Sequence, residues 1–123
     1  NIDETPDYPS GFDCDNIISV ANLIFDGNLE ASSNYGVKNV DIAAPGTYIV
    51  STVTDGYGFM SGTSMAAPMV TGVAAFLYSY RTDLELKDVR DVILNSARKL
   101  DTLTDKVACG GMLDAYSAIT YGK

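Results

Sequence analysis

Histidine is missing from this sequence of 123 residues. It is the usual general base that activates a serine at neutral pH, so the chain cannot hold a complete Ser-His-Asp triad by itself. Basic residues are scarce as well, with 8 Lys and Arg against 16 Asp and Glu and a formal net charge of -8. Because such a surface repels nucleic acids and anionic membranes, we expect neither as a partner.

A hydrophobic run long enough to cross a membrane is also missing, since the longest apolar tract contains Thr71 and Gly72 and falls short of ~20 residues. The acidic, polar N-terminus does not resemble a signal peptide, and because the first residue is not methionine we expect a longer parent protein. The two cysteines, Cys14 and Cys109, follow neither a CxxC nor a metal-ligand spacing. We expect buried free thiols, while a disulfide stays open if the fold brings the two together.

Apolar residues make up 46% of the chain and charged residues 20%, which is typical of one globular domain. An apolar, β-branched run predicts a buried strand over residues 16–25. Further strands are predicted over residues 40–44 and 48–53, and an Asp-Gly turn predicts a hairpin that continues into residues 57–60. The apolar tract that follows predicts a central helix from about Thr63 to Tyr80, buried all round. Strands first and helices last indicate an α/β layered domain with mostly parallel strands.

Two further helices are predicted towards the C-terminus. Residues 82–85 fit a capping box. The helix after it carries apolar residues at intervals of three or four, namely Leu86, Val89, Ile93, Ala97 and Leu100. We interpret its opposite side as solvated and without function, and it contains Lys87, Asp88, Arg90 and Asp91. A last short helix is expected from Met112 to about Thr120.

Carboxylates gather among turn-forming residues in the segment 1–15, at Asp3, Glu4, Asp7, Asp13 and Asp15. An exposed loop is the simpler interpretation. A calcium site is the alternative, because hard cations take several oxygen ligands, but no EF-hand spacing is present. We therefore predict no metal site in this chain.

The candidate functional residue is Ser64, which lies in the sequence SGTSMAAP at residues 61–68, directly before the apolar helix tract. A serine at this place lies at the positive end of the helix dipole, where developing negative charge is favoured. A helix cap is the simpler interpretation, since Ser and Thr side chains often accept the N–H groups of the first turn. The wider sequence decides between the two.

That wider sequence resembles the subtilisin-like serine peptidases, the subtilase family. Residues 61–68 resemble the nucleophile motif of the family, including the proline four residues after the serine. Residues 41–46 resemble the strand and turn before that motif, and residues 110–115 resemble the closing turn and helix. The Asp7-Tyr8-Pro9 stretch, followed by residues 16–20, is similar to the segment after the oxyanion asparagine of the family.

The resemblance implies a partial subtilisin-like three-layer fold, with residues 1–123 as the C-terminal portion of one catalytic domain. It implies a serine endopeptidase as the parent protein, with Ser64 as nucleophile and its backbone N–H as one oxyanion donor. Thr63 and Asp7 are the implied substrate-binding residues, and Asp7 would favour a basic side chain. A solvent-facing loop aspartate is the simpler interpretation of Asp7. The aspartate, histidine and oxyanion asparagine motifs of the family fall outside this sequence, and Asn1 does not replace the last, so we expect the isolated chain to be inactive.

The resemblance also implies partners and a location. The substrate would be a peptide or protein, and the natural partner of this chain would be the N-terminal half of the catalytic domain. Without that half, apolar faces and an open sheet edge are left uncovered, so we expect the isolated chain to self-associate. The family further implies a secreted or cell-surface protein that needs no cofactor for its reaction, with room for structural calcium in the full-length protein.

Two alternatives belong to other functional classes. The chain could be part of a non-catalytic pseudoenzyme or an interaction fragment that only binds partners. It could also be a Ser-Lys hydrolase that works without histidine, with Lys38 or Lys87 as the base. This last hypothesis predicts that the chain reacts with an active-site-directed fluorophosphonate on its own, and the peptidase hypothesis predicts that it does not.

Overall fold

The computed structural model describes residues 1–122, within which the larger sheet has four strands in the order β1-β2-β6-β5. Strand β1 (Val20–Leu23) runs parallel to β2 (Ile42–Pro45), and β2 runs parallel to β6 (Gly111–Met112). Strand β5 (Arg98–Lys99) is the antiparallel neighbour of β6. The α/β class and the mostly parallel sheet predicted from the sequence are confirmed.

Both faces of this sheet are covered by buried side-chain clusters. Since successive side chains of a strand point to opposite sides, one strand contributes to both clusters. In β2, Ile42 and Ala44 pack on the helix side, whereas Ala43 packs on the other side. The second side forms its own buried cluster with residues from β1 and from loops at both ends of the chain: Ile2, Ala21, Leu23, Val40, Ala43, Leu103 and Val107. Loops on that side, with the 3-10 helix η1 (Asp101–Leu103), thus lie opposite the helices.

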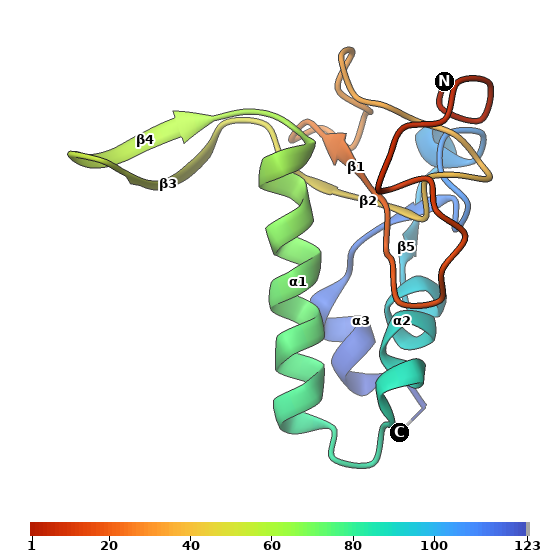
Figure 1. Cartoon of the computed structure of the whole chain (residues 1–123). Helices are drawn as coiled ribbons and strands as arrows, with labels where there is room; N and C mark the ends of the chain where they lie inside the picture. Colours follow the sequence, from red (N-terminus) through yellow and green to blue (C-terminus); the bar gives the residue numbers. More distant parts are fainter. Residues whose placement is uncertain (123) are drawn as a thin grey trace.

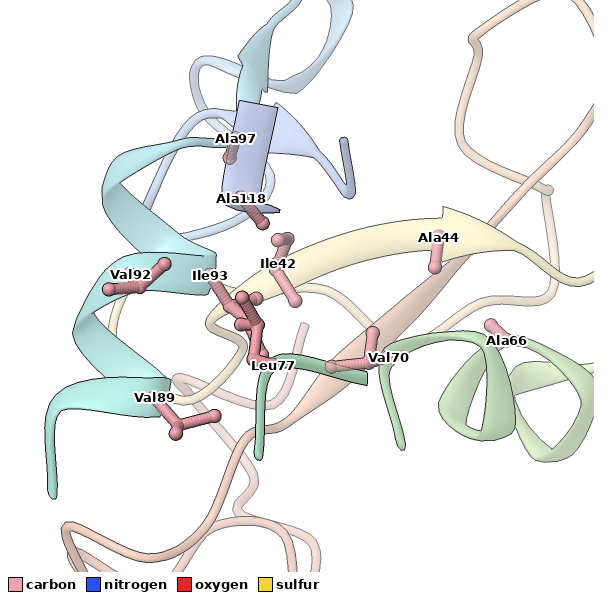
Figure 2. Close-up of a cluster of buried hydrophobic side chains, with 10 residues drawn as sticks. All are labelled: Ile42, Ala44, Ala66, Val70, Leu77, Val89, Val92, Ile93, Ala97 and Ala118. Carbon is pink, nitrogen blue, oxygen red and sulfur yellow. The ribbon is translucent and has the colours of Figure 1, made fainter. Parts of the chain in front are cut away.

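Helix α1 (Thr63–Tyr80) is the long helix beside the sheet in Figure 1, and its bounds confirm the predicted ones. Its inner face packs Ala66, Val70 and Leu77 against β2 and the two C-terminal helices, as Figure 2 shows. The prediction of burial all round is wrong. No element within residues 1–122 covers the outer face, where side chains are between 36% and 56% exposed at Met69, Phe76 and Tyr80.

Helices α2 (Leu86–Asn95) and α3 (Ala115–Thr120) lie side by side next to α1 in Figure 1. Both were predicted, although α3 begins later than expected because residues 111–112 pair in β6. Asp114 caps α3 by accepting the N–H of Ser117 at 2.9 Å.

The capping of α2 differs from its prediction. Glu85 is the N-cap residue, and its N–H donates to the side chain of Asp88 at 2.9 Å. The predicted box at residues 82–85 is therefore wrong by three positions, because the chain turns at residues 81–84 before the helix begins. Of the predicted apolar stripe, Val89, Ile93 and Ala97 are buried, and the side chain of Leu86 lies outside the described part of the structure.

The second sheet is the predicted hairpin, formed by β3 (Ile49–Val53) and β4 (Gly56–Met60) in antiparallel register. It projects sideways from the body at the N-terminal end of α1 (Figure 1). Most of its residues are exposed, including Val50 at 56% and Phe59 at 71%. The strands and their turn thus agree with the hairpin predicted from the sequence.

Two smaller predictions are corrected by the structure. The apolar run at residues 16–25 forms a strand only over β1, and Phe25 at its end is fully exposed. Cys14 and Cys109 are free, and Cys14 is exposed where burial was expected. Burial raises the pKa of the Cys109 thiol, which is therefore protonated at neutral pH. Among residues 1–122, no helix has both the length and the apolar character needed to span a bilayer.

Candidate active site

Ser64 is exposed at the second position of α1, and Gly62 is the N-cap. Gly62 has a φ of 154°, a conformation that is open almost only to glycine, and no side chain caps the helix. The helix-cap interpretation of Ser64 is therefore wrong. Its backbone N–H belongs to the first turn, where N–H groups lack acceptors within the helix and point towards the N-terminus.

The turn before Ser64 is tied to the turn after β2. The N–H of Gly62 donates to the carbonyl oxygen of Gly46 at 2.8 Å, and the N–H of Tyr48 donates to Ser61 Oγ at 2.9 Å. Gly46 must be glycine for this approach, because a Cβ atom there would come within 2.6 Å of the carbonyl oxygen of Gly62. These contacts explain how the parallel sheet positions the serine.

A cavity of about 570 Å³ opens beside this serine. Three of the residues that line it are the ones implied by the family resemblance, namely Asp7, Thr63 and Ser64. Its remaining lining comes from the N-terminal loop, the approach to β1 and the loop before β2: Ile2, Pro9, Ser10, Ile17, Ile18, Ser19, Val20, Asn34, Val40 and Ala67. The fold thus brings the implied site residues together around one opening, although their functional roles stay predictions.

Asp7 is the only charged residue among the described residues that line this cavity. Its Oδ2 accepts a hydrogen bond from the side-chain amide of Asn34 at 3.2 Å. Sequence reasoning missed Asn34, because an asparagine in a small polar loop carries no signal of its own. The contact spans 27 positions in sequence and exists only in the folded chain.

One wall of the cavity is held by a charged residue that was predicted to have no function. Arg90 of α2 donates through Nε to the carbonyl oxygen of Ile17 at 3.1 Å and forms an ion pair of 2.6 Å with Asp41. Asp41 in turn accepts the N–H of Ser19 at 2.8 Å. Ile17 and Ser19 both line the cavity, so the interpretation of Arg90 as merely solvated is wrong.

Neither lysine of the Ser-Lys alternative reaches this cavity. Lys38 lines a different pocket, together with Asp41 and Arg90. Lys87 is exposed on α2 and pairs with Glu85 at 2.9 Å. Neither lysine therefore lines the cavity that Ser64 lines, and the structure disfavours a Ser-Lys hydrolase.

The acidic N-terminal segment serves the fold in this structure. The carboxylate of Asp3 accepts the backbone N–H groups of Lys38 and Asn39 at 2.9–3.1 Å, which ties the first residues to the loop before β2. Within residues 1–122, no group of three or more acidic, cysteine or histidine side chains is arranged to hold a metal ion.

Comparison with known proteins gives one consistent family. The model described as the subtilase family matches residues 1–111. Subtilisin-like protease 1 of Plasmodium berghei is 39% identical over 119 residues, which cover 91% of this chain and 20% of that protein. An extracellular basic protease of Dichelobacter nodosus is 34% identical and covers 97% of this chain and 21% of its own length. The chain therefore spans about a fifth of the length of these curated relatives.

Solved structures agree with the fold. A chain from a structure concerning the assembly of the subtilase cytotoxin SubAB superposes with a TM-score of 0.80 at 31% identity, covering 92% of this chain and 41% of that one. The prenylagaramide maturation protease PagA superposes with a TM-score of 0.78 at 29% identity, covering 91% of this chain and 44% of that one.

Proposed function

Because this chain belongs to the subtilase family, we propose that it is the C-terminal portion of the catalytic domain of a serine endopeptidase. The observation that carries the proposal is the position of Ser64, exposed at the start of α1 and on the wall of a cavity that Asp7 and Thr63 also line. The reaction that we propose is the hydrolysis of peptide bonds through an acyl-enzyme.

In the first step, Ser64 Oγ attacks the carbonyl carbon of the substrate and its proton passes to a histidine from the preceding part of the protein, which an aspartate orients. The C–N bond then breaks, and the amine leaves with that proton. Water then gives a proton to the same histidine and attacks the ester carbon. The bond from that carbon to Ser64 Oγ breaks, the acid is released, and the histidinium returns the proton to Ser64 Oγ.

The negative charge on the substrate oxygen needs donors that already point at it. The backbone N–H of Ser64 is suited to this task, because it lies in the first turn of α1 at the positive end of the helix dipole. We propose that an asparagine outside this chain supplies the second donor. Since loss of one such donor costs about 10²–10³ in rate, the isolated chain, which also lacks the base, should be inactive.

For substrate preference, we propose that Asp7 and Thr63 contact the substrate and that Asp7 favours a basic side chain. The negative charge of Asp7 has no counter-charge among the described residues of the cavity. To test this, the full-length protein is compared with its Asp7→Ser variant on matched peptides that carry Arg or Leu before the scissile bond. The preference for Arg should fall by about tenfold, because a close charge pair at an interface typically contributes about 1.5 kcal/mol or more. An unchanged ratio would remove Asp7 from the site.

For partners, we propose that the N-terminal half of the catalytic domain covers the outer face of α1, which is exposed within residues 1–122. The edge of β1 is less open than the sequence predicted, because the carbonyl oxygen of Asn22 accepts the N–H of Glu30 and its N–H donates to Ser33 Oγ. The substrate is a peptide or protein, and the reaction needs no cofactor. Structural calcium stays an expectation for the full-length protein.

For localisation, we propose secretion or display at the cell surface. The support is a relative from Dichelobacter nodosus that is named as extracellular. Fractionation of the source cells and detection of the protein with an antibody against residues 1–123 tests this directly.

The nucleophile is tested by labelling the full-length protein with a fluorophosphonate and mapping the modified residue by mass spectrometry. We expect labelling at Ser64 and none in the Ser64→Ala variant. Ser61→Ala is not a suitable control because Ser61 holds Tyr48, so Ser51→Ala on the exposed hairpin serves instead and should be labelled normally. A folded full-length protein that stays unlabelled would favour the non-catalytic alternative, and labelling of the isolated chain would revive the Ser-Lys one.

A further inference from the structure

We propose that Asn34 is a specificity-determining residue, which holds the Asp7 carboxylate towards the cavity beside Ser64 so that the cavity selects substrate side chains with a cationic end. This inference rests on the proposed peptidase function and deepens it. It adds a residue that neither the sequence motifs nor the family resemblance assigns.

A residue outside its own loop fixes the Asp7 side chain. The backbone of Asp7 is held within its own loop, where its carbonyl oxygen accepts the N–H of Gly11 at 2.7 Å. Its carboxylate is different. Among residues 1–122, the side-chain amide of Asn34 is the one group that donates to it, at 3.2 Å to Oδ2. The direction of the negative charge therefore depends on Asn34.

The loop that carries Asn34 is held by hydrogen bonds on both sides of this residue. Its neighbour Ser33 is buried, and Ser33 Oγ accepts the N–H of Asn22 in β1 at 2.9 Å and donates to the carbonyl oxygen of Asn34 at 3.0 Å. On the other side, the carbonyl oxygen of Tyr35 accepts the N–H of Ile2 at 2.9 Å. Asn34 thus sits on backbone that is tied to the sheet and to the N-terminal segment.

The cavity beside Ser64 combines one carboxylate with an apolar wall. The other lining residues carry no charge, and many of them are aliphatic: Ile2, Ile17, Ile18, Val20 and Val40. An aliphatic stem that ends in a cation matches this combination, because the stem packs on the apolar wall while the cation meets the carboxylate. With Oδ2 of Asp7 bonded to Asn34, Oδ1 stays open for the ligand. Arginine and lysine side chains fit this description.

The test measures the cleavage of matched Arg and Leu peptides by the full-length protein. In Asn34→Ala, the ratio of kcat/KM for Arg over Leu should fall about 2–10-fold, as expected for the loss of one hydrogen bond, while kcat/KM for Leu stays constant. A purely structural role would lower both values together. Asn95→Ala, at an exposed position at the end of α2, is the matched control and should keep the wild-type ratio.

Because Asn34 acts through Asp7, the two changes should not add. In the Asp7→Ser background, Asn34→Ala should leave the ratio where Asp7→Ser alone puts it. A further fall of the same size in that background would overturn the inference, and so would an unchanged ratio in the single variant.

A binding measurement separates this inference from the proposed reaction. The Ser64→Ala form of the full-length protein is titrated by calorimetry with benzamidine, a cation, and with benzamide, its neutral analogue. Benzamidine should bind more tightly than benzamide. Asn34→Ala should reduce the ratio of the two dissociation constants about 2–10-fold. If the two ligands bind equally, or if the preference for benzamidine does not depend on Asn34, the inference is wrong. If the preference is present but the full-length protein is not labelled by the fluorophosphonate, only the peptidase proposal is wrong.

Discussion

The two faces of α1 have similar residues and opposite surroundings. The inner face buries Ala66, Val70 and Leu77 under β2, α2 and α3 (Figure 2). The outer face exposes Phe76 at 47% and Tyr80 at 56%, and these two rings stack with their centroids 5.6 Å apart. Apolar content therefore does not distinguish the covered face from the uncovered one. We attribute the exposure of the outer face to the absence of the N-terminal half of the catalytic domain, which covers this face in our proposal.

The largest expected effect breaks the inner face. Leu77→Ala removes a side chain with no exposed surface and should lower the free energy of unfolding by about 2–5 kcal/mol. Its neighbour Phe76→Ala should cost about 0.5 kcal/mol in the isolated chain, because the ring is already half exposed. Urea unfolding of both variants, in the isolated chain and in the full-length protein, measures this. In the full-length protein the cost of Phe76→Ala should rise to about 3–5 kcal/mol, and equal costs in both forms would contradict a covered outer face.

The second prediction concerns association through the outer face. The isolated chain should sediment above its monomer mass, since an exposed aromatic face of this kind favours contact with another copy. Phe76→Glu should shift the sedimentation distribution towards monomer, because burying a carboxylate in such a contact is unfavourable.

Ser51→Glu on the hairpin is the matched control, because it adds the same charge at an exposed serine that does not lie on α1. It should leave more of the association intact than Phe76→Glu. A wild-type chain that sediments as a single monomer would contradict the prediction.

The smallest effect concerns α3, which contributes Ala118 to the cover of the inner face. The Ser117 N–H and the Arg98 guanidinium bond the Asp114 carboxylate and hold the pKa of that group below its ordinary value of 3.8. Asp114→Ala should therefore lower the free energy of unfolding by about 1 kcal/mol at pH 7.

The pH dependence of that difference follows from the lowered pKa. A carboxyl whose pKa is depressed by folding contributes stability above its unfolded pKa and loses it as the pH falls through the folded value. The gap between wild type and Asp114→Ala should thus shrink below about pH 4 and be constant above it. Urea unfolding at several pH values measures the gap, and a gap that stays the same from pH 7 down to pH 3 would contradict the prediction.

The local elements of this fold were predictable because each depends on neighbours in sequence. Periodicity and turn residues placed α1, the β3–β4 hairpin and the two later helices, with errors only at their ends. The short strands β5 and β6 were missed, since their pairing partners are distant and two residues carry no pattern. The motif around Ser64 was legible because its residues are contiguous.

The sequence by itself determined the family, the order of the elements and the candidate nucleophile, all of which depend on contiguous residues. The tertiary structure alone decided which face of α1 is covered, that Arg90 supports the wall of the cavity through Ile17, and that Asn34 meets Asp7. Burial and hydrogen bonding between distant segments depend on how the layers pack, and this packing is a property of the whole chain. Local composition does not encode it.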